Sequence, residues 1–145
     1  MKISSSAFSE GQPIPAKYTC DGSDTIPPLA FADVPPEARS LALVMDDPDA
    51  PGGTYDHWVM WNIPPDTKGV EEGKAPRGVA GRNSWKKNAY GGPCPPDREH
   101  RYFFRIYALD TTLNLPASSN KADLEKAMEG HVLTEAKLMG RYERG

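Results

Sequence analysis

The stretch Asp47-Pro-Asp-Ala-Pro-Gly-Gly-Thr-Tyr-Asp-His-Trp-Val-Met-Trp-Asn-Ile-Pro64 decides the fold of this chain. It follows a hydrophobic run, Leu41 to Met45, that stops at closely spaced carboxylates and prolines. It ends in a second run of aromatic and β-branched residues, which opens on His57. Such residues favour strands, and Asp and Pro favour turns. We therefore predict two strands that meet at a rigid acidic loop, with an imidazole at the start of the second strand.

A second stretch, Tyr90 to Tyr102, repeats the same order of a Gly/Pro loop, a histidine (His100) and a strand. Side chains at strand ends beside stiff loops can converge on a ligand while the scaffold holds them. The two stretches therefore predict two walls of one pocket. The alternative for each histidine alone is a hydrogen-bonded residue that only supports a strand end.

The composition predicts one folded domain spanning residues 1–145. Charged residues make up 26% and hydrophobic residues 38% of the 145 residues, as in soluble globular proteins. The chain has 15 prolines, about twice the usual ~5%. Because proline fixes φ and lacks a backbone donor, this content favours strands joined by stiff loops over helices.

Charge and hydropathy exclude several classes of function. A net charge of −3 gives no reason to expect nucleic acid as a partner. No run approaches ~18 apolar residues, and the N-terminus lacks the apolar segment of a signal peptide, so we expect a cytoplasmic protein without integral membrane contact. Cys20 and Cys94 lack zinc-site spacing, and we expect free thiols in a reducing compartment. A Cys20–Cys94 disulfide is the alternative.

Periodicity and turn residues predict the elements of an all-β dominated, antiparallel β-sandwich. One helix is expected over Lys121–Glu129, with Asn120 as its N-cap and Gly130 after its end. Residues 65–90 are expected to be mostly loop. The main strands are expected at residues 40–46, 57–63 and 100–109, and shorter strands within residues 1–10, 18–20 and 29–31. A further strand is expected at residues 132–138, where a helix is the alternative.

Asp47 and Asp49 directly follow a strand that reads as buried, where an unpaired charge is costly. They therefore need partners, for which we consider His57, Arg82, Arg98 and Arg101. The alternative is an ordinary turn, since Asp and Pro both favour turns. The clustered prolines also make Ala50–Pro51 a candidate cis peptide bond.

The sequence gives little support for catalysis. Asp47, Asp49, His57 and His100 could in principle ligate a metal, but no motif of H-x-x-x-H type occurs. There is also no G-x-S-x-G elbow and no Walker or dinucleotide glycine pattern. We therefore expect a non-catalytic binding protein with no cofactor and no metal. A hydrolase or metal enzyme that uses the same Asp/His residues is the alternative.

Four segments resemble the phosphatidylethanolamine-binding protein family, also called Raf kinase inhibitor-like proteins. They are Asp47-Pro-Asp-Ala-Pro51, His57-Trp-Val-Met-Trp-Asn-Ile-Pro64, Tyr90-Gly-Gly-Pro-Cys-Pro-Pro96 and His100-Arg-Tyr-Phe-Phe-Arg-Ile-Tyr-Ala-Leu-Asp110. Tyr18-Thr-Cys-Asp-Gly22, Gly81-Arg-Asn83 and Gly140-Arg-Tyr-Glu-Arg144 are similar to the compact prokaryotic branch. The likeness spans nearly the whole chain.

The resemblance implies a β-sandwich with one or two short C-terminal helices and a small anion pocket for phosphate-like groups, including phospholipid headgroups. It also implies a homodimer and, as an alternative function, inhibition of a serine protease or kinase. The extended C-terminal helix of animal members has no counterpart here, so their kinase partners need not transfer. The implied ligand-binding residues are Asp47, Asp49, Pro51, His57, Gly92, Cys94, Pro95, Pro96, His100 and Tyr102.

Overall fold

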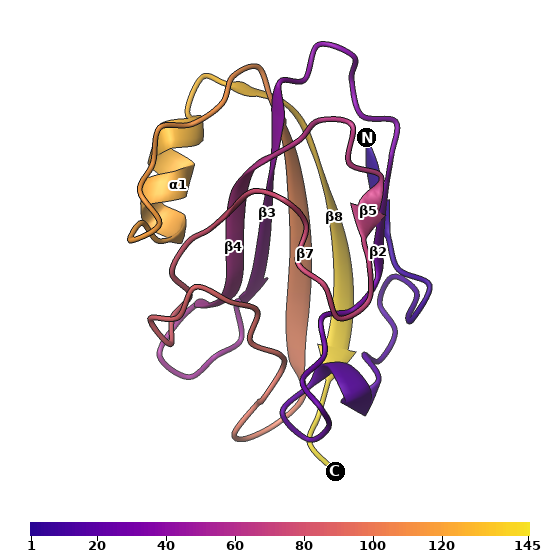
Figure 1. The fold of residues 1–145 in the computed structure, drawn as a ribbon. Helices are drawn as coiled ribbons and strands as arrows, with labels where there is room; N and C mark the ends of the chain where they lie inside the picture. Colours follow the sequence, from indigo (N-terminus) through magenta and orange to yellow (C-terminus); the bar gives the residue numbers. More distant parts are fainter.

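The computed structural model describes all residues 1–145 as two antiparallel sheets and one helix (Figure 1). The smaller sheet has the order β1-β2-β5, with β1 at Lys2–Ser4, β2 at Leu29–Ala32 and β5 at Gly69–Val70. The larger sheet has the order β6-β4-β3-β7-β8. Its strands are β3 (Ser40–Asp47), β4 (Tyr55–Ile63), β6 (Val79–Ala80), β7 (His100–Leu109) and β8 (Val132–Tyr142). The predicted antiparallel β-sandwich is therefore confirmed.

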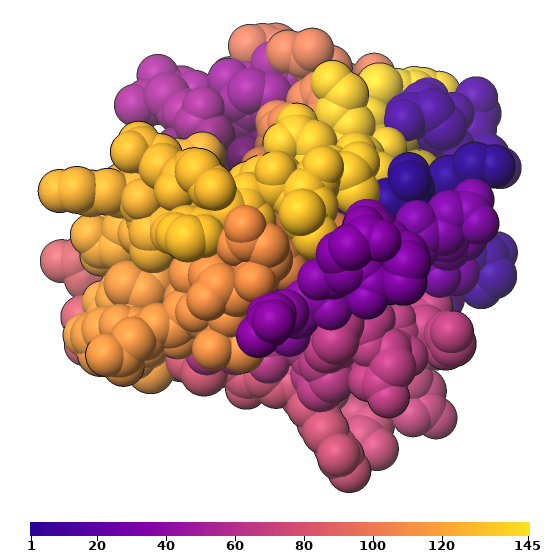
Figure 2. All heavy atoms as spheres, turned by 90° about the horizontal axis from the view of Figure 1, so that it is seen from above, coloured from indigo at the N-terminus to yellow at the C-terminus, as the bar shows by residue number.

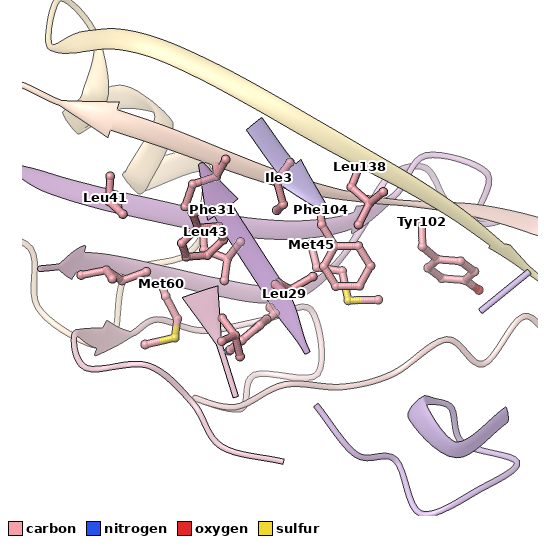
Figure 3. Packing of buried hydrophobic residues seen from close by; sticks show 14 of the residues in the cluster. Ile3, Leu29, Phe31, Leu41, Leu43, Met45, Met60, Tyr102, Phe104 and Leu138 are labelled. Carbon is pink, nitrogen blue, oxygen red and sulfur yellow. The ribbon is translucent and has the colours of Figure 1, made fainter. Parts of the chain in front are cut away.

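The main hydrophobic core lies between the two sheets. Because successive side chains of a strand point to opposite faces, every second residue of the long strands enters this core. Figure 3 shows Ile3 and Phe31 from the small sheet packing toward Leu43 and Phe104 from the large one. Tyr102 lies at one end of this cluster (Figure 3). The core thereby supports one end of the sandwich with fully buried side chains.

The helix α1, Lys121–Met128, covers the other face of the large sheet. Leu124 and Met128 are buried there in a second cluster with Val44 and Trp61. The central strand β3 is consequently buried on both faces, as its unbroken apolar run predicts. The ends of β3 and β4 are thus fixed from both sides, which suits them to hold a site.

The helix begins where the sequence predicts. The Asn120 side chain accepts a hydrogen bond from the Asp123 N–H, and the Asp123 carboxylate accepts one from the Asn120 N–H. This reciprocal capping box satisfies two backbone donors that the first turn leaves without partners. Gly130 follows the helix with a φ of +78°, a conformation that favours glycine.

The N-terminal segment protects part of the edge strand β8, which is longer than predicted. Gly11 N–H donates to the Met139 carbonyl and Ile14 N–H donates to the Arg141 carbonyl, both at 2.8 Å. Figure 2 views the molecule from above and shows the indigo N-terminal atoms beside the yellow C-terminal ones. These bonds reduce the length of exposed strand edge on which another chain could pair.

Two local predictions are wrong. The expected strand at residues 18–20 is replaced by a 3-10 helix at Ala16–Tyr18, because both the N–H and the hydroxyl of Thr19 donate back to the Ala16 carbonyl. The Ala50–Pro51 bond is trans, since the chain has no cis peptide bond. Instead, the Asp47 carboxylate accepts the Asp49 N–H at 2.8 Å and closes the turn locally.

The expectation of free thiols is also wrong, because Cys20 and Cys94 form a disulfide across a separation of 74 residues. The Cys20 N–H donates to the Pro93 carbonyl at 3.1 Å, which holds the two loops side by side. This contact brings together residues far apart in the sequence, so spacing could not reveal it. Disulfides are rare in the cytosol of mesophiles, and the cytoplasmic location stays a prediction. The one α-helix is too short and too polar to cross a membrane.

Candidate functional site

A cavity of about 540 Å³ opens at the end of the sandwich where β3 ends and β7 begins, the lower end in Figure 1. Two loops form its rims, one after β3 and one before β7. The predicted two walls therefore meet around one pocket. Its lining residues are Asp47, Ala50, Pro51, Gly52, Gly53, Thr54, Tyr55, His57, Trp85, Cys94, Pro95, Pro96, His100 and Tyr102.

Among the ten residues that the family resemblance implies, Asp49 and Gly92 do not line this pocket. The Asp49 carboxylate instead accepts two hydrogen bonds from the Arg101 guanidinium and one from its backbone N–H, each at 2.9 Å. The hydrogen bonds with Arg101 lower the pKa of Asp49 to about 2. Gly92 N–H donates to the Asp24 carboxylate at 2.9 Å. Both residues therefore shape the rims, and the other eight surround the cavity.

His57 reaches the pocket because β4 carries an extra residue beside β3. Met45 pairs with Trp58 and Asp46 pairs with Asp56, which leaves His57 without a partner in the ladder. Such a bulge redirects the unpaired side chain, and bulges are common beside functional sites. The His57 ring lies edge-on to the Tyr102 ring, with 5.3 Å between their centroids.

The sequence suggests His57 as a partner of Asp47 and Asp49, but this pairing is wrong, because its Nδ1 faces the Gly91 carbonyl at 2.8 Å. A carbonyl only accepts hydrogen bonds, so Nδ1 carries the proton. Burial lowers the pKa of His57, although the Gly91 carbonyl and Asp47 oppose this shift. The neutral ring therefore leaves Nε2 as a hydrogen-bond acceptor. The sequence could not show this, because no pattern ties residue 57 to the backbone of residue 91.

His100 differs, because both of its ring nitrogens face carboxylates. Nδ1 donates to Asp47 Oδ2 at 2.6 Å and Nε2 donates to Asp97 Oδ1 at 2.7 Å. Burial opposes charge on the ring, but the hydrogen bonds with Asp47 and Asp97 outweigh it and raise the pKa of His100. His100 is therefore held as an imidazolium, with Asp47 as the orienting carboxylate. Sequence reasoning missed Asp97, which belongs to the second stretch but was assigned no role.

Tyr102 supplies an unsatisfied hydroxyl to the pocket. The residue is fully buried, and its Oη makes no hydrogen bond of good geometry, although the Asp47 carboxylate and the Cys94 backbone lie close enough to act on its pKa. Burial raises the pKa of this phenol, so it stays protonated at neutral pH. A buried O–H without a partner costs roughly 1–3 kcal/mol. A ligand oxygen that accepts this hydrogen bond would recover that energy.

Tyr55 and Trp85 form an aromatic wall that sequence reasoning did not assign to the site. Their ring centroids are 4.8 Å apart, and the Trp85 ring meets His57 edge-on at 4.9 Å. Trp85 is 40% exposed despite its size. Gly91 permits this placement, because a Cβ at residue 91 would collide with the Trp85 ring. A large exposed apolar side chain at a pocket mouth is typical of a ligand-contacting position.

The residues just before Asp47 and His57 point to the opposite side of the large sheet. Asp46 pairs with Arg105 at 3.1 Å and with Lys121 at 3.4 Å. Asp56 pairs with the same Lys121 ammonium at 3.1 Å. Lys121, at the start of α1, therefore joins β3 and β4 on the side of the large sheet opposite the pocket, which the following residues Asp47 and His57 line.

No group of three or more His, Cys, Asp or Glu side chains is arranged to hold a metal ion. Asp47 and Asp97 are each engaged with His100, and His57 is engaged with a backbone carbonyl. Among the polar side-chain atoms of the buried residues that line the cavity, the Tyr102 hydroxyl and His57 Nε2 are the two that make no hydrogen bond of good geometry within the protein.

Comparison with protein families gives a match to the model described as phosphatidylethanolamine-binding protein over residues 4–143. A UPF0098 protein of Methanothermobacter thermautotrophicus is 53% identical and is aligned over all of both chains. A UPF0098 protein of Chlamydia muridarum is 46% identical over 99% of both chains. These names carry no specific function.

Two solved structures share the fold. One is described as a putative phosphatidylethanolamine-binding protein homologue from Chlamydia trachomatis and has a TM-score of 0.96 and 44% identity, over 99% of this chain and 97% of that one. The other is E. coli YbcL, described as a new member of the mammalian family. It has a TM-score of 0.91 and 28% identity, over 99% of this chain and 98% of that one.

Proposed function

This chain belongs to the phosphatidylethanolamine-binding protein family, and we propose that it is a non-catalytic binding protein whose pocket takes a phosphate-like group. The ligand would be a phosphorylated small molecule or a phospholipid headgroup. The pocket is of suitable size, since cavities of ~300–1,000 Å³ are usual for small-molecule sites. At about 540 Å³ it accommodates a phosphate with an organic substituent.

The observation that carries the proposal is the buried Tyr102 hydroxyl on the cavity wall, which makes no hydrogen bond of good geometry within the protein. Buried polar groups are almost always hydrogen-bonded, so an exception on a cavity wall points to a missing acceptor. An anionic oxygen is the strongest acceptor for a neutral O–H donor. The imidazolium of His100 lies at the same end of the strands, where Asp47 and Asp97 offset its charge.

His57 refines the choice of anion. Its neutral ring presents an acceptor at Nε2, because Nδ1 donates to Gly91. A phosphate monoanion satisfies both groups at once, with an oxygen that accepts from Tyr102 and a P–O–H that donates to His57. The proposal therefore favours phosphoryl groups over anions that carry no proton near neutral pH, such as sulfate.

The aromatic wall supports a substituent on the phosphate. Tyr55 and Trp85 offer apolar surface at the mouth, and Trp85 is the more exposed of the two. An ammonium placed over an indole face gains roughly 0.5–2 kcal/mol. A phosphoethanolamine headgroup has the phosphate and the ammonium that this arrangement would contact.

Binding without chemistry is favoured because the pocket offers no activated nucleophile. Cys94 is the one cysteine on the pocket wall, and its sulfur is bonded to Cys20 in the disulfide. Ser84 lies outside the lining, where its hydroxyl accepts the Asp56 N–H. Regulation of a protein partner, inhibition of a protease or kinase, and a homodimer stay predictions.

The test is a titration with inorganic phosphate, phosphoethanolamine and sulfate, followed by calorimetry and by phosphorus NMR for the two phosphates. The variant Tyr102→Phe removes only the hydroxyl and should weaken phosphate binding about tenfold or more, since a hydrogen bond to a charged group contributes roughly 1.5–3 kcal/mol. Tyr107→Phe is the matched control, because Tyr107 lies on the same strand and outside the pocket. Equal affinity of wild type and Tyr102→Phe, or no binding by either, would refute the proposal.

A further inference from the structure

We propose that Asp97 is a tethered competitor that occupies His100 in the empty pocket and sets the affinity of the site for anions. The proposal rests on the proposed function and concerns the same pocket. Its basis is the 2.7 Å hydrogen bond from His100 Nε2 to Asp97 Oδ1. His100 has one further ring donor, and Asp47 already holds it. No donor of His100 is thus left for a ligand while Asp97 is in place.

The two carboxylates on His100 lie in different surroundings. The Asp47 side chain is 4% exposed and comes from the central strand β3. The Asp97 side chain is 47% exposed and comes from the loop before β7. A buried partner on a strand is a permanent support, whereas a half-exposed one on a loop can exchange with another anion at small cost in desolvation.

The loop that carries Asp97 is anchored at its two ends and makes no backbone hydrogen bonds between them. Cys94 is anchored by its disulfide, and His100 begins β7. No backbone hydrogen bond joins residues 95–98 to the rest of the chain. Asp97 Oδ1 also accepts the adjacent Arg98 N–H, which keeps the carboxylate in reach of His100 without fixing the loop to the sheet. Segments with few backbone hydrogen bonds open locally at low free energy.

A tethered group competes at a high effective concentration, in the millimolar range for short flexible links. An incoming phosphate that uses His100 must displace Asp97 and therefore binds with an apparent Kd raised by the occupied fraction. If the Asp97-bound form makes up about 80–90% of empty molecules, its removal lowers the apparent Kd about 5–10-fold. Removal of Asp97 would leave the affinity for neutral ligands that contact only Tyr55 and Trp85 unchanged.

The experiment titrates inorganic phosphate into wild type, Asp97→Ala and Glu99→Ala, with affinity measured by calorimetry. Glu99→Ala is the matched control, because it removes the same charge from the same loop while its carboxylate faces Arg141 at 2.9 Å instead of His100. We expect about 5–10-fold tighter phosphate binding in Asp97→Ala and less than a twofold change in Glu99→Ala. Circular dichroism and thermal unfolding check that each variant is folded.

A second readout follows the His100 side chain directly by ¹⁵N NMR of its ring nitrogens. Phosphate should shift the Nε2 signal in wild type, and Asp97→Ala without ligand should already show a changed Nε2 signal. Unchanged affinity in Asp97→Ala, or equal gains in Asp97→Ala and Glu99→Ala, would overturn the inference while the proposed function stands. Absence of phosphate binding in all three proteins would instead reject the proposed function. Binding by Asp97→Ala alone would support the inference.

Discussion

Opening the Cys20–Cys94 disulfide should destabilise the protein strongly. The crosslink spans a separation of 74 residues, and the chain-entropy relation for a loop of that size gives about 4.5 kcal/mol at 25 °C. Measured effects are usually 2–4 kcal/mol. Because the bond joins two surface loops and not two strands, we expect about 3 kcal/mol for the double replacement of Cys20 and Cys94 by serine. For 145 residues this corresponds to a melting temperature lower by about 6–12 °C.

The assay is guanidinium unfolding of wild type and of the double serine variant, each with and without a reductant. Reductant should move the wild-type midpoint to that of the variant and leave the variant unchanged. The reasoning is refuted if the two proteins unfold at the same midpoint without reductant, or if thiol titration of the unreduced, denatured wild type finds two free thiols.

Three further predictions concern pH and capping. Folding lowers the pKa of His57, so the contribution of this residue to the unfolding free energy is present above pH ~6.5 and is lost as the pH falls. Folding raises the pKa of His100, so the contribution of that residue is present below pH ~6.5 and is lost as the pH rises. Asp47→Asn should therefore reduce the loss of unfolding free energy between pH 6.5 and 9, and an unchanged slope would contradict this. The pKa of Asp49 falls to about 2, so its contribution is present above ~4 and lost toward pH 2, and Asp49→Asn should show a smaller loss there in acid unfolding. Asn120→Ala should cost about 1 kcal/mol by chemical denaturation through loss of the capping box, with no change in phosphate affinity.

The long strands and the helix were predictable because their information is local. Local composition predicts all three long strands: the apolar run of β3, the aromatic and β-branched residues of β4, and the aromatic strand that begins at His100. The helix has its cap at Asn120 and its terminating glycine within a single stretch. Where one segment carries both pattern and boundary, sequence reasoning gives the element.

The errors arise where distant segments decide. The Cys20–Cys94 bond depends on the meeting of two loops. The 3-10 helix at Ala16–Tyr18 is a local exception, since Thr19 donates back to the Ala16 carbonyl three residues earlier. Within the site, eight implied residues surround the cavity and the aspartate support of His100 is found in Asp47, but the second partner of His100, Asp97, and the partner of His57 were missed. The support of His57 is a backbone carbonyl, and a carbonyl is carried by every residue. The exposed Trp85 ring packs against Gly91, where a Cβ would collide with it, and no local pattern in the sequence indicates this contact.

Lys121 joins the two strands that end at the pocket from the opposite side of the large sheet. Its ammonium bridges Asp46 and Asp56, whose neighbours Asp47 and His57 face the pocket on the far side of the sheet. Since each carboxylate is one peptide unit from a pocket residue, we expect a ligand that shifts either strand end to change the distances around this ammonium. Isotope labelling of lysine therefore offers a way to read occupancy from a position that no ligand touches, without any label in the pocket itself.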